Sequence, residues 1–394
     1  MREILVPQWT IQLRRDGYGG YRMHSRQPLN VGFVGGSVNS AIGNVHRIAS
    51  SMDRQFSLAS GCFSRNPSVN TETANAWGVP EDRLYPDFLA MLNDERGLLD
   101  AVVVLTPVRS HFEVIRAALS LGIDVISEKP LCTSPSEVQQ LCELQQQSSK
   151  KLLVTFNYTG YPMVRELKRR VERGDFGSIH SVRLSMQQEG YLRVNAEGAP
   201  IVPQSWRLED SDIPTVSLDL GTHVFHLLHF VLGVWPKHVF ARMSSNGNFP
   251  AVVDDVDVLA DLDDGSHASA WWSKCALGHQ NGLSIEIFGT EGSAYWLQAD
   301  PESILLSNNA GHKTQIHRGS RDCLVAQEPR YNRFKMGHPS GFIEAFSNLY
   351  YDISEALRSQ QTNHFVFDAE NSLTVMRALK ALSTSAKTQS WQEV

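Results

Sequence analysis

Short apolar runs alternate with amphipathic segments between residue 28 and about residue 155. Two of these runs, Ala101–Leu105 and Ile123–Ser127, are rich in branched residues, and apolar residues recur at helical spacing between them. This order predicts a buried parallel strand, a crossover helix and a second parallel strand. Further strands are expected at Leu29–Val34, Phe56–Phe63 and Leu152–Phe156, with helices from about Ala41, around Thr71–Trp77, at Phe88–Leu92 and from Ser134. The alternation predicts a doubly wound parallel sheet over residues 28–155.

The pattern changes after residue 155. A helix is expected at Pro162–Arg173, and strand-like runs then follow with few helices between them. The runs are Ile179–Met186, His238–Ser244, Val256–Leu262, His267–Lys274, Leu283–Phe288 and Ser293–Leu297. Asp264-Gly265 is typical of a hairpin turn between two of them. Residues 156–394 are therefore expected to form an α+β domain with a large, mostly antiparallel open sheet, and late helices are expected at Gly341–Arg358 and Ala369–Ser383. The overall fold class is α/β.

Residues 1–27 precede the first predicted strand and show no clear periodicity. They mix apolar residues with a Gly-Tyr-Gly-Gly-Tyr stretch, and they lack the long apolar core of a signal peptide. One interpretation is a disordered, tag-like extension. The other is an arm that packs on a partner subunit, and the apolar content favours the arm.

Composition narrows the class of protein. The chain has 394 residues, enough for two or three domains, with 42% hydrophobic and 20% charged residues, as in ordinary globular proteins. Its net charge of −6 does not suggest a nucleic-acid partner. No apolar run approaches the roughly 20 residues of a membrane span. The five cysteines are scattered and none has metal-site spacing, so we expect reduced thiols, a cytoplasmic location and no bound metal.

The first predicted strand runs into the glycine-rich turn Gly35-Gly36-Ser37 and then into a helix that contains Gly43. Such a turn can hold a pyrophosphate on main-chain N–H groups and on the positive end of the helix dipole. The spacing departs from the usual G-x-G-x-x-G, because Ser37 takes the place of the second glycine and Gly43 comes about three residues late. The position at the start of a strand–helix series still favours a dinucleotide site.

The second predicted strand ends in Ser64-Arg65-Asn66, with no acidic residue. An acidic residue there binds the ribose 2′-hydroxyl of NAD, whereas an arginine with small polar neighbours accepts the 2′-phosphate of NADP. We therefore expect NAD or NADP as the cofactor, with a slight preference for NADP. The alternative is that Arg65 is a solvated loop residue and that main-chain contacts accept NAD.

Polar residues follow the strands on both sides of the crossover helix. Thr106-Pro107 and then His111 come after the first strand, and Glu128-Lys129-Pro130 comes after the second. Ligands of open α/β sheets bind outside the carboxyl ends of the strands, so a lysine at this place is a candidate for chemistry. The alternative is an ordinary surface lysine after a strand.

A second polar cluster, Asp219-Leu220-Gly221-Thr222-His223, begins an apolar helix. Asp219 and His223 are four residues apart and would share a face of a helix. A carboxylate beside an imidazole fixes the ring and raises its basicity, which suits a general base. The alternatives are a capping Asp219 with a satisfied His223, and a zinc site that includes His226 and His229. Zinc is disfavoured because the three histidines drift round the helix.

The ordered set of a glycine-rich strand end, TPxxxH, EKP and DxGxH resembles the Gfo/Idh/MocA oxidoreductases over about residues 29–380. The resemblance implies a Rossmann domain, a second domain whose open sheet often forms the oligomer interface, and a nicotinamide cofactor. It implies that Lys129 binds the reacting oxygen, that His223 transfers the proton and that Asp219 orients His223. It implies cofactor contacts from Gly35, Gly36, Ser37, Gly43, Ser64, Arg65, Thr106, Pro107, His111, Glu128 and Lys129. It implies substrate contacts from Asn157, Tyr158, Trp206, Arg207 and His226.

The function expected from this resemblance is hydride transfer between NAD(P) and a hydroxyl or keto carbon of a sugar, a sugar derivative or a cyclitol. An alternative is a redox-neutral glycoside hydrolase that oxidises, eliminates and reduces again on tightly held NAD. A non-catalytic NAD(P)-binding sensor is a third class, which the joint presence of Lys129, Asp219 and His223 disfavours. A homodimer or homotetramer through the C-terminal sheet is expected. The family often has an acidic residue where this chain has His226, so the substrate is not assigned.

Overall fold

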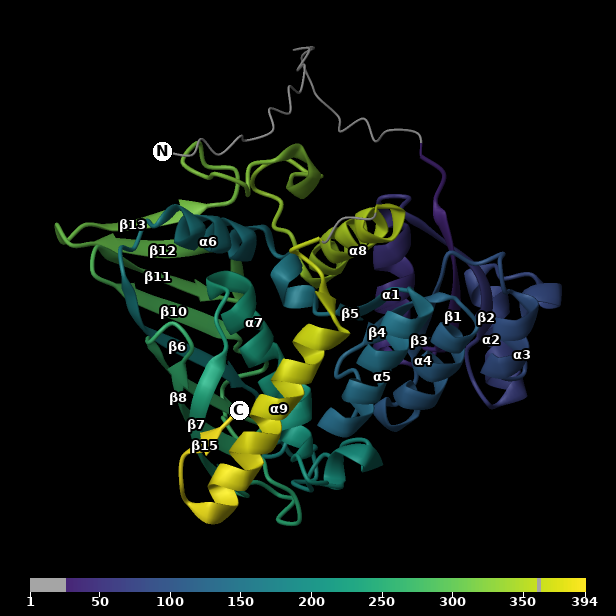
Figure 1. Cartoon of the computed structure of the whole chain (residues 1–394), viewed down its shortest axis with the longest axis horizontal. Coiled ribbons are helices and arrows are strands. Elements are labelled where there is room, and N and C mark those ends of the chain that lie inside the picture. The colour runs from purple at the N-terminus through teal and green to yellow at the C-terminus, as the bar shows by residue number, and fades with distance from the viewer. Residues whose placement is uncertain (1–25, 360–362) are drawn as a thin grey trace, which may run out of the picture.

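Figure 1 shows the computed structural model of the chain, in which residues 26–359 and 363–394 are described. Residues 1–25, which make up nearly all of the expected extension or arm, lie outside the described residues. The described chain forms two sheets with helices packed on and between them. No helix within the described ranges is long and apolar enough to cross a membrane.

The first sheet has six strands in the order β14-β5-β4-β3-β1-β2. Its strands are β1 (Leu29–Gly35), β2 (Phe56–Cys62), β3 (Ala101–Leu105), β4 (Asp124–Glu128), β5 (Leu152–Thr155) and β14 (Phe367–Asp368). The connecting helices are α1 (Ala41–Met52), α2 (Pro67–Trp77), α3 (Phe88–Asp94), α4 (His111–Ser120) and α5 (Pro135–Ser148). All neighbouring strands are parallel except β5 and β14. The predicted doubly wound sheet is confirmed.

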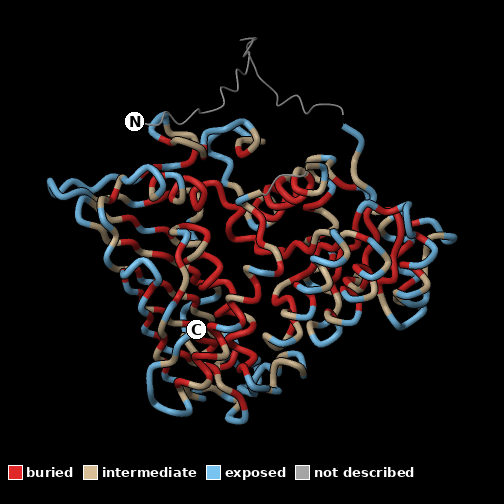
Figure 2. The backbone as a smooth tube through the Cα atoms, viewed as in Figure 1, coloured by how far each residue is buried: buried red, intermediate tan, exposed pale blue. Residues whose placement is uncertain are grey.

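Both faces of this sheet are buried, as its nearly continuous apolar strands require. In β3, Ala101, Val103 and Leu105 pack into a cluster with α1, α2 and α8 (Phe342–Arg358). Val102 and Val104 point the other way and pack with α3, α4 and α5. Figure 2 shows this as buried strands beneath helices with exposed outer faces. Each fully buried valine contributes roughly 2 kcal/mol to the hydrophobic stabilisation of the sheet.

The second sheet has nine strands in the order β13-β12-β11-β10-β6-β9-β8-β7-β15. Its strands are β6 (Ile179–Gln187), β7 (Pro236–Ser244), β8 (Asp255–Leu262), β9 (His267–Ser273), β10 (Ser284–Gly289), β11 (Gly292–Leu297), β12 (Asp300–Asn308), β13 (Lys313–His317) and β15 (Gln392–Glu393). Only β6 and β9 pair in parallel, so the expected mostly antiparallel sheet is confirmed.

Helices α6 (Pro162–Arg173), α7 (Thr222–Leu232) and α9 (Ala369–Thr388) pack against one face of this second sheet (Figure 1). The opposite face is open. In β8, for example, Val256, Val258 and Ala260 are buried beneath the helices, whereas Asp257 and Leu259 are exposed. This two-residue alternation is typical of a sheet with one covered face.

Three features differ from the sequence prediction. The series of strands does not stop at Leu297, because β12 and β13 extend the sheet to a polar edge at which Ile316 is the buried residue of β13. Helix α2 begins at Pro67, since the side chain of Asn66 caps it by accepting from two main-chain N–H groups. The end of the chain also returns to the first sheet, where β14 pairs with β5 and α8 packs on α1.

Candidate active site

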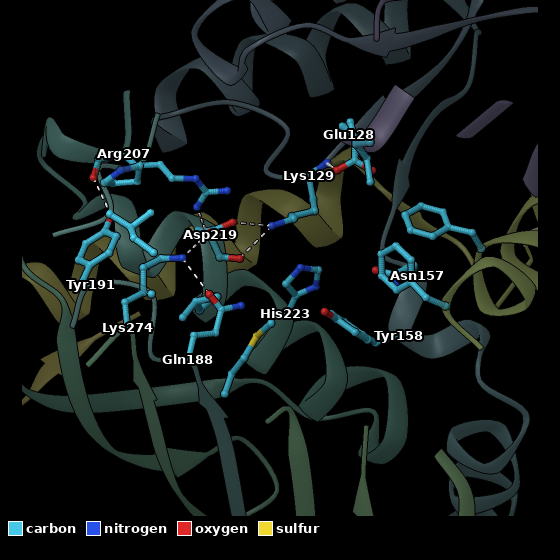
Figure 3. A pocket seen from close by; sticks show the side chains of 18 residues that line it. Glu128, Lys129, Asn157, Tyr158, Gln188, Tyr191, Arg207, Asp219, His223 and Lys274 are labelled. Atoms are coloured by element: carbon cyan, nitrogen blue, oxygen red, sulfur yellow. Dashed lines mark hydrogen bonds and ion pairs between the residues drawn. The ribbon is translucent and has the colours of Figure 1, made fainter. Parts of the chain in front are cut away.

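A cavity of about 400 Å³ lies between the carboxyl ends of the first sheet and the second sheet (Figure 3). It is lined by residues that come from loops and strand ends of both parts of the chain. The polar ones are Glu128, Lys129, Asn157, Tyr158, Gln188, Tyr191, Arg207, Asp219, His223 and Lys274. A cavity of this size with several polar groups fits one small polar ligand.

Asp219 lies at the centre of these groups. It is carried by a single π-helical turn, Ser217–Gly221, and such turns often occur at functional sites. Asp219 Oδ1 accepts a hydrogen bond from Lys129 Nζ at 3.1 Å, and Oδ2 pairs with Lys274 Nζ at 2.8 Å and with Arg207. Burial raises the pKa of the Asp219 carboxyl, but the three cations outweigh burial and hold the pKa well below its usual value of 3.8. Asp219 is therefore ionised.

Lys129 is held in place from two directions. Its Nζ also donates to the main-chain oxygen of Asp219 at 2.9 Å, and its main-chain N–H donates to Glu128 Oε2 at 3.1 Å. Glu128 Oε1 in turn accepts from Thr155 at 2.7 Å and lies 2.8 Å from His46 Nε2. Burial raises the pKa of Glu128, but His46 and Lys129 outweigh burial and leave the pKa lowered. Glu128, an expected cofactor ligand, lines the cavity, but both of its carboxylate oxygens are bonded within the protein.

His223 lines the cavity from the first turn of α7. Its ring packs edge-on against Tyr158 at 4.7 Å and against Phe156 at 5.9 Å between ring centroids. Burial and the charge of Lys129 lower the pKa of His223 well below 6.5, and the charge of Asp219 only partly opposes them. The imidazole is neutral at neutral pH and can accept a proton.

Asp219 was expected to orient the imidazole of His223, but no hydrogen bond joins the two side chains. His223 Nδ1 is buried and has no hydrogen-bond partner among the described residues, while the Asp219 carboxylate is occupied by cations. The Asp219 carboxylate is directed instead to Lys129, Lys274 and Arg207, which pair with both of its oxygens. Asp219 acts on His223 through its charge.

Three buried polar atoms in or next to the cavity are unpaired within the described residues. Asn157 Nδ2 and His223 Nδ1 line the cavity, and Thr106 Oγ1 lies in the turn after β3, each without a hydrogen-bond partner in the described part of the chain. An unpaired buried polar atom costs about 1–3 kcal/mol, so such atoms are rare unless a ligand or water pairs with them. Their positions fit a polar substrate beside a bound cofactor.

The glycine turn fits a dinucleotide despite its altered spacing. Gly35 and Gly36 have φ angles of 81° and 74°, where other residues are strained. A Cβ on Gly43 would lie 1.8 Å from the main-chain oxygen of Gly36, so the helix packs directly on the turn. Ser40 caps α1 by accepting from the Gly43 N–H at 3.2 Å. The residues Gly36–Ser40 therefore lengthen the turn, yet Gly43 still provides the close packing that the third glycine gives in this motif.

Ser64 and Arg65 lie beside this turn, because β1 and β2 end as neighbours with Val34 paired to Cys62. Arg65 is exposed and makes no ion pair among the described residues. It precedes the Asn66 cap at the start of α2. An exposed guanidinium at this place can contact either the ribose of NAD or the 2′-phosphate of NADP.

Thr106 and Pro107 follow β3, next to the turn. His111 is buried, and its ring nitrogens lie 2.8 Å from the main-chain oxygen of Thr106 and 3.1 Å from that of Pro130. The ring thus links the segments after β3 and β4. Burial lowers its pKa, although bonds to these carbonyls oppose the shift. His111, an expected cofactor contact, is therefore buried behind these two segments, and its ring fixes their positions relative to each other.

The structure corrects the assignment of His226 as a substrate ligand. Its buried ring stacks on Phe156 at 4.1 Å and meets Phe367 edge-on at 3.9 Å, away from the cavity lining. His229 stacks on Trp235 at 3.9 Å. The three histidines therefore do not converge, and the described residues contain no cluster of metal-ligating side chains.

Trp206, also expected to touch the substrate, does not line the cavity. Its ring lies 4.3 Å beneath the Arg207 guanidinium carbon, and its indole N–H donates to Gln204 at 2.9 Å. It supports Arg207, which does line the cavity. The other expected substrate contacts, Asn157, Tyr158 and Arg207, line the cavity.

The sequence analysis missed Lys274, Gln188 and Tyr191. Lys274 is the last residue of the predicted strand His267–Lys274, and in the structure it directly follows β9. Its Nζ donates to Gln188 Oε1 at 3.0 Å. The one available signal was a lysine at the end of an apolar strand, the same signal that marked Lys129. His46 was missed because its position inside α1 resembles that of any core residue.

Comparison with known proteins agrees with the fold and the site described above. Residues 29–156 match the oxidoreductase family with an NAD-binding Rossmann fold, and residues 164–295 match the GFO/IDH/MocA C-terminal domain. The oxidoreductase YfiI of Bacillus subtilis is 28% identical over 86% of this chain and 87% of its own length. Levoglucosan dehydrogenase of Pseudarthrobacter phenanthrenivorans is 27% identical over 68% of this chain and 73% of its own.

A solved structure extends the similarity to the fold. The inositol dehydrogenase homologue of Azotobacter vinelandii, solved with NADH and myo-inositol, has a TM-score of 0.84 and 27% identity, and the match covers 93% of this chain and 98% of that one. The fold and the site define an NAD-binding oxidoreductase with a Rossmann sheet and a second, open sheet. The chain belongs to the GFO/IDH/MocA family.

Proposed function

We propose that this protein is an NAD(P)-dependent dehydrogenase or reductase that acts on a hydroxyl or keto carbon of a sugar, a sugar derivative or a cyclitol. The observation that carries the proposal is that Lys129 and the neutral imidazole of His223 line one polar cavity beside the carboxyl end of β4. Oxidation of an alcohol needs a proton acceptor and a cation near the developing negative charge on oxygen. These two residues supply both.

In this proposal each residue has a separate role. Lys129 Nζ donates a hydrogen bond to the reacting oxygen, and Asp219 holds the ammonium in position. His223 takes the hydroxyl proton during oxidation and returns it during reduction. A bound nicotinamide would supply the hydride acceptor or donor for the carbinol carbon, so that oxidation would yield a ketone, reduced cofactor and one proton. Asn157 and Tyr158 contact other hydroxyl groups of the substrate.

The relatives support the substrate class. Levoglucosan dehydrogenase is named for an anhydrosugar, and the Azotobacter vinelandii homologue was solved with a cyclitol. The cavity of about 400 Å³ has room for one small polyol of this kind. The buried unpaired atoms Asn157 Nδ2 and His223 Nδ1 favour a ligand rich in hydroxyl groups.

For the cofactor, we propose contacts from the glycine turn and from the segments after β2 and β3. Residues 28–155 would form the dinucleotide-binding domain, and residues 156–394 the domain that binds the substrate and forms the oligomer.

Arg65 supports a slight preference for NADP. Arg65→Ala is expected to raise the KM for NADP⁺ about tenfold and to change the KM for NAD⁺ little, since it removes one charge-assisted contact with a 2′-phosphate. Steady-state kinetics with both cofactors measure this. Equal effects on both would contradict the preference.

The open face of the second sheet supports a homodimer or homotetramer. Leu259, Tyr295 and Leu305 are exposed there on β8, β11 and β12. Apolar residues on a flat exposed sheet favour burial against a second copy. We also propose a cytoplasmic location, which the five free cysteines support.

The experiment that tests the function is a panel assay. NAD⁺ and NADP⁺ are supplied with aldoses, cyclitols and anhydrosugars, and the absorbance of reduced nicotinamide is followed. Net cofactor reduction supports a dehydrogenase. Glycoside cleavage with tightly held cofactor and no net absorbance change would support the redox-neutral hydrolase instead.

The pH profile tests the role of His223. Because its pKa lies well below 6.5, kcat/KM for oxidation should stay constant through neutral pH and fall only below the usual histidine range, where the ring becomes protonated. His223→Asn is expected to lower kcat by about 10²-fold and to remove that acidic fall. An unchanged profile in the variant would assign the proton transfer to another group.

A further inference from the structure

Two cations of the cavity are not used by the proposed hydride transfer. Arg207 and Lys274 approach Asp219 from the side opposite Lys129 (Figure 3). We propose that the substrate is a sugar acid, and that its carboxylate binds to Arg207 and Lys274 while its reacting hydroxyl lies at Lys129 and His223. This inference rests on the proposed function and narrows its substrate class.

The charge balance of the cavity is the first support. Three cations face one carboxylate, that of Asp219. The lining has one other carboxylate, Glu128, whose oxygens are bonded to His46, Thr155 and the main-chain N–H of Lys129, so the three cations exceed the carboxylates of the lining by one. Burying cations without an equal number of anions is costly, so the site favours a ligand that brings negative charge.

The hydrogen-bonding capacity of Arg207 is the second support. One of its terminal nitrogens pairs with Asp219, and its Nε and second terminal nitrogen have no hydrogen-bond partner among the described residues. These two form one edge of the planar guanidinium, which matches the two oxygens of a carboxylate. Trp206 supports the plane from below, and Tyr191 O–H donates to the Arg207 main-chain oxygen at 2.9 Å. The group is therefore held in place before any ligand binds.

Lys274 completes the same wall of the cavity. Its Nζ is buried and has two acceptors, Asp219 Oδ2 at 2.8 Å and Gln188 Oε1 at 3.0 Å. An ammonium has three donors, so one remains for a ligand. Burial lowers the pKa of Lys274, and the charges of Arg207 and Lys129 lower it further, against Asp219. A bound carboxylate would oppose these effects and keep Lys274 charged.

The carboxylate serves only for binding in this proposal. It takes no part in bond making or breaking, so the balance of the reaction is that of the proposed function, with a ring hydroxyl oxidised to a ketone. Its role is to fix which carbon faces Lys129 and His223, because a two-point anchor on one side of the cavity sets the orientation of a rigid ring.

The test compares matched sugars that differ only at C6, where one carries a hydroxymethyl group and the other a carboxylate. The purified protein is assayed with NAD⁺ and NADP⁺ on D-glucose against D-glucuronate and on D-galactose against D-galacturonate, at constant ionic strength. The expected kcat/KM is at least about tenfold higher for one acid than for its neutral partner, as one or two charge-assisted hydrogen bonds provide. D-glucose 6-phosphate is a third arm, and a preference for it over the acids would overturn the carboxylate assignment.

Substitutions show which residues cause the preference for the acid over the neutral sugar. Arg207→Gln and Lys274→Met should each remove most of the ratio between acid and neutral substrate, chiefly through the KM for the acid. Arg193→Gln is the matched control, because Arg193 is an exposed arginine near the cavity that does not line it. An equal loss of the ratio in Arg193→Gln would show general charge attraction and would overturn the local site.

Binding measured without turnover separates the two proposals. In the presence of NADH, D-glucuronate or D-galacturonate should raise the Tm of the protein more than the neutral sugar does, and Arg207→Gln should remove the difference. Such selective binding without oxidation of any sugar would support the acid site and count against the dehydrogenase. Equal treatment of acid and neutral sugars, in binding and in turnover, would overturn the acid site and leave the dehydrogenase standing.

Discussion

Lys129→Ala is expected to lower kcat by about 10³-fold, which is what the loss of a cation at a developing oxyanion costs in enzymes of many kinds. The fold should survive the change. Asp219, the main partner of Lys129, keeps its pairs with Lys274 and Arg207, so no buried carboxylate is left without a cation. The measurement is the rate of reduced nicotinamide formation with the substrate found in the panel assay.

Two controls accompany this prediction. Circular dichroism and thermal unfolding should show Lys129→Ala folded, with a Tm close to that of the unaltered protein. Lys380→Ala removes a partly exposed lysine that pairs with the exposed Asp212, and it should leave kcat unchanged. A Lys129→Ala variant with near-normal kcat would move the oxygen-binding role to Lys274, the other lysine at Asp219.

Asp219→Asn is expected to have the largest effect on stability. It leaves Lys129, Arg207 and Lys274 facing one another without an anion, and removing one partner of buried ion pairs costs about 3 kcal/mol or more. Activity should be lost as well, since Lys129 loses its anchor. Urea unfolding at pH 7 measures the first effect, and the panel assay measures the second.

The pH dependence of stability gives a sharper version of this test. The folded-state pKa of Asp219 lies well below 3.8, so its contribution to stability is present above the unfolded value and is lost as pH falls below it towards the folded pKa. The difference in unfolding free energy between the unaltered protein and Asp219→Asn should therefore be largest at neutral pH and shrink below about pH 4. A difference that does not change with pH would show that the carboxylate charge is not the cause.

A second substitution separates charge from packing. Adding Lys274→Met to Asp219→Asn removes one of the uncompensated cations. If charge repulsion is the cause, the double variant should recover part of the lost stability, and the two effects will not be additive. Further destabilisation in the double variant would point to lost packing around the cavity.

The order of the elements could be predicted because it depends on local pattern. The apolar strands of the first sheet, the Ser134 cap and the glycine turn each show their character within a few residues. Lys129 became a candidate because it directly follows a strand at the carboxyl edge of a sheet, and His223 because it lies four residues after Asp219 at the start of a helix. The edge strands β12 and β13 were missed because few of their residues are buried.

Local pattern failed where a neighbour in space decides the role of a residue. His226 follows His223 by three residues, but a rotation of about 60° about the helix axis turns it from the cavity into a stack of aromatic rings. Asp219 was expected to orient His223, but its carboxylate pairs with three cations from other elements instead. Neither outcome is visible in the spacing of the residues.

The sequence by itself determined the two sheets, the dinucleotide turn and the candidates Lys129 and His223, because periodicity and turn chemistry act over short stretches of chain. Only the tertiary structure decided that Arg207 and Lys274 converge on Asp219, and that Glu128 is bonded to His46. These partners come from elements far apart in the sequence, and their contacts depend on how helices, loops and strand ends pack within each part of the chain. The charge of the cavity, and with it the inferred acidic substrate, follows from that packing.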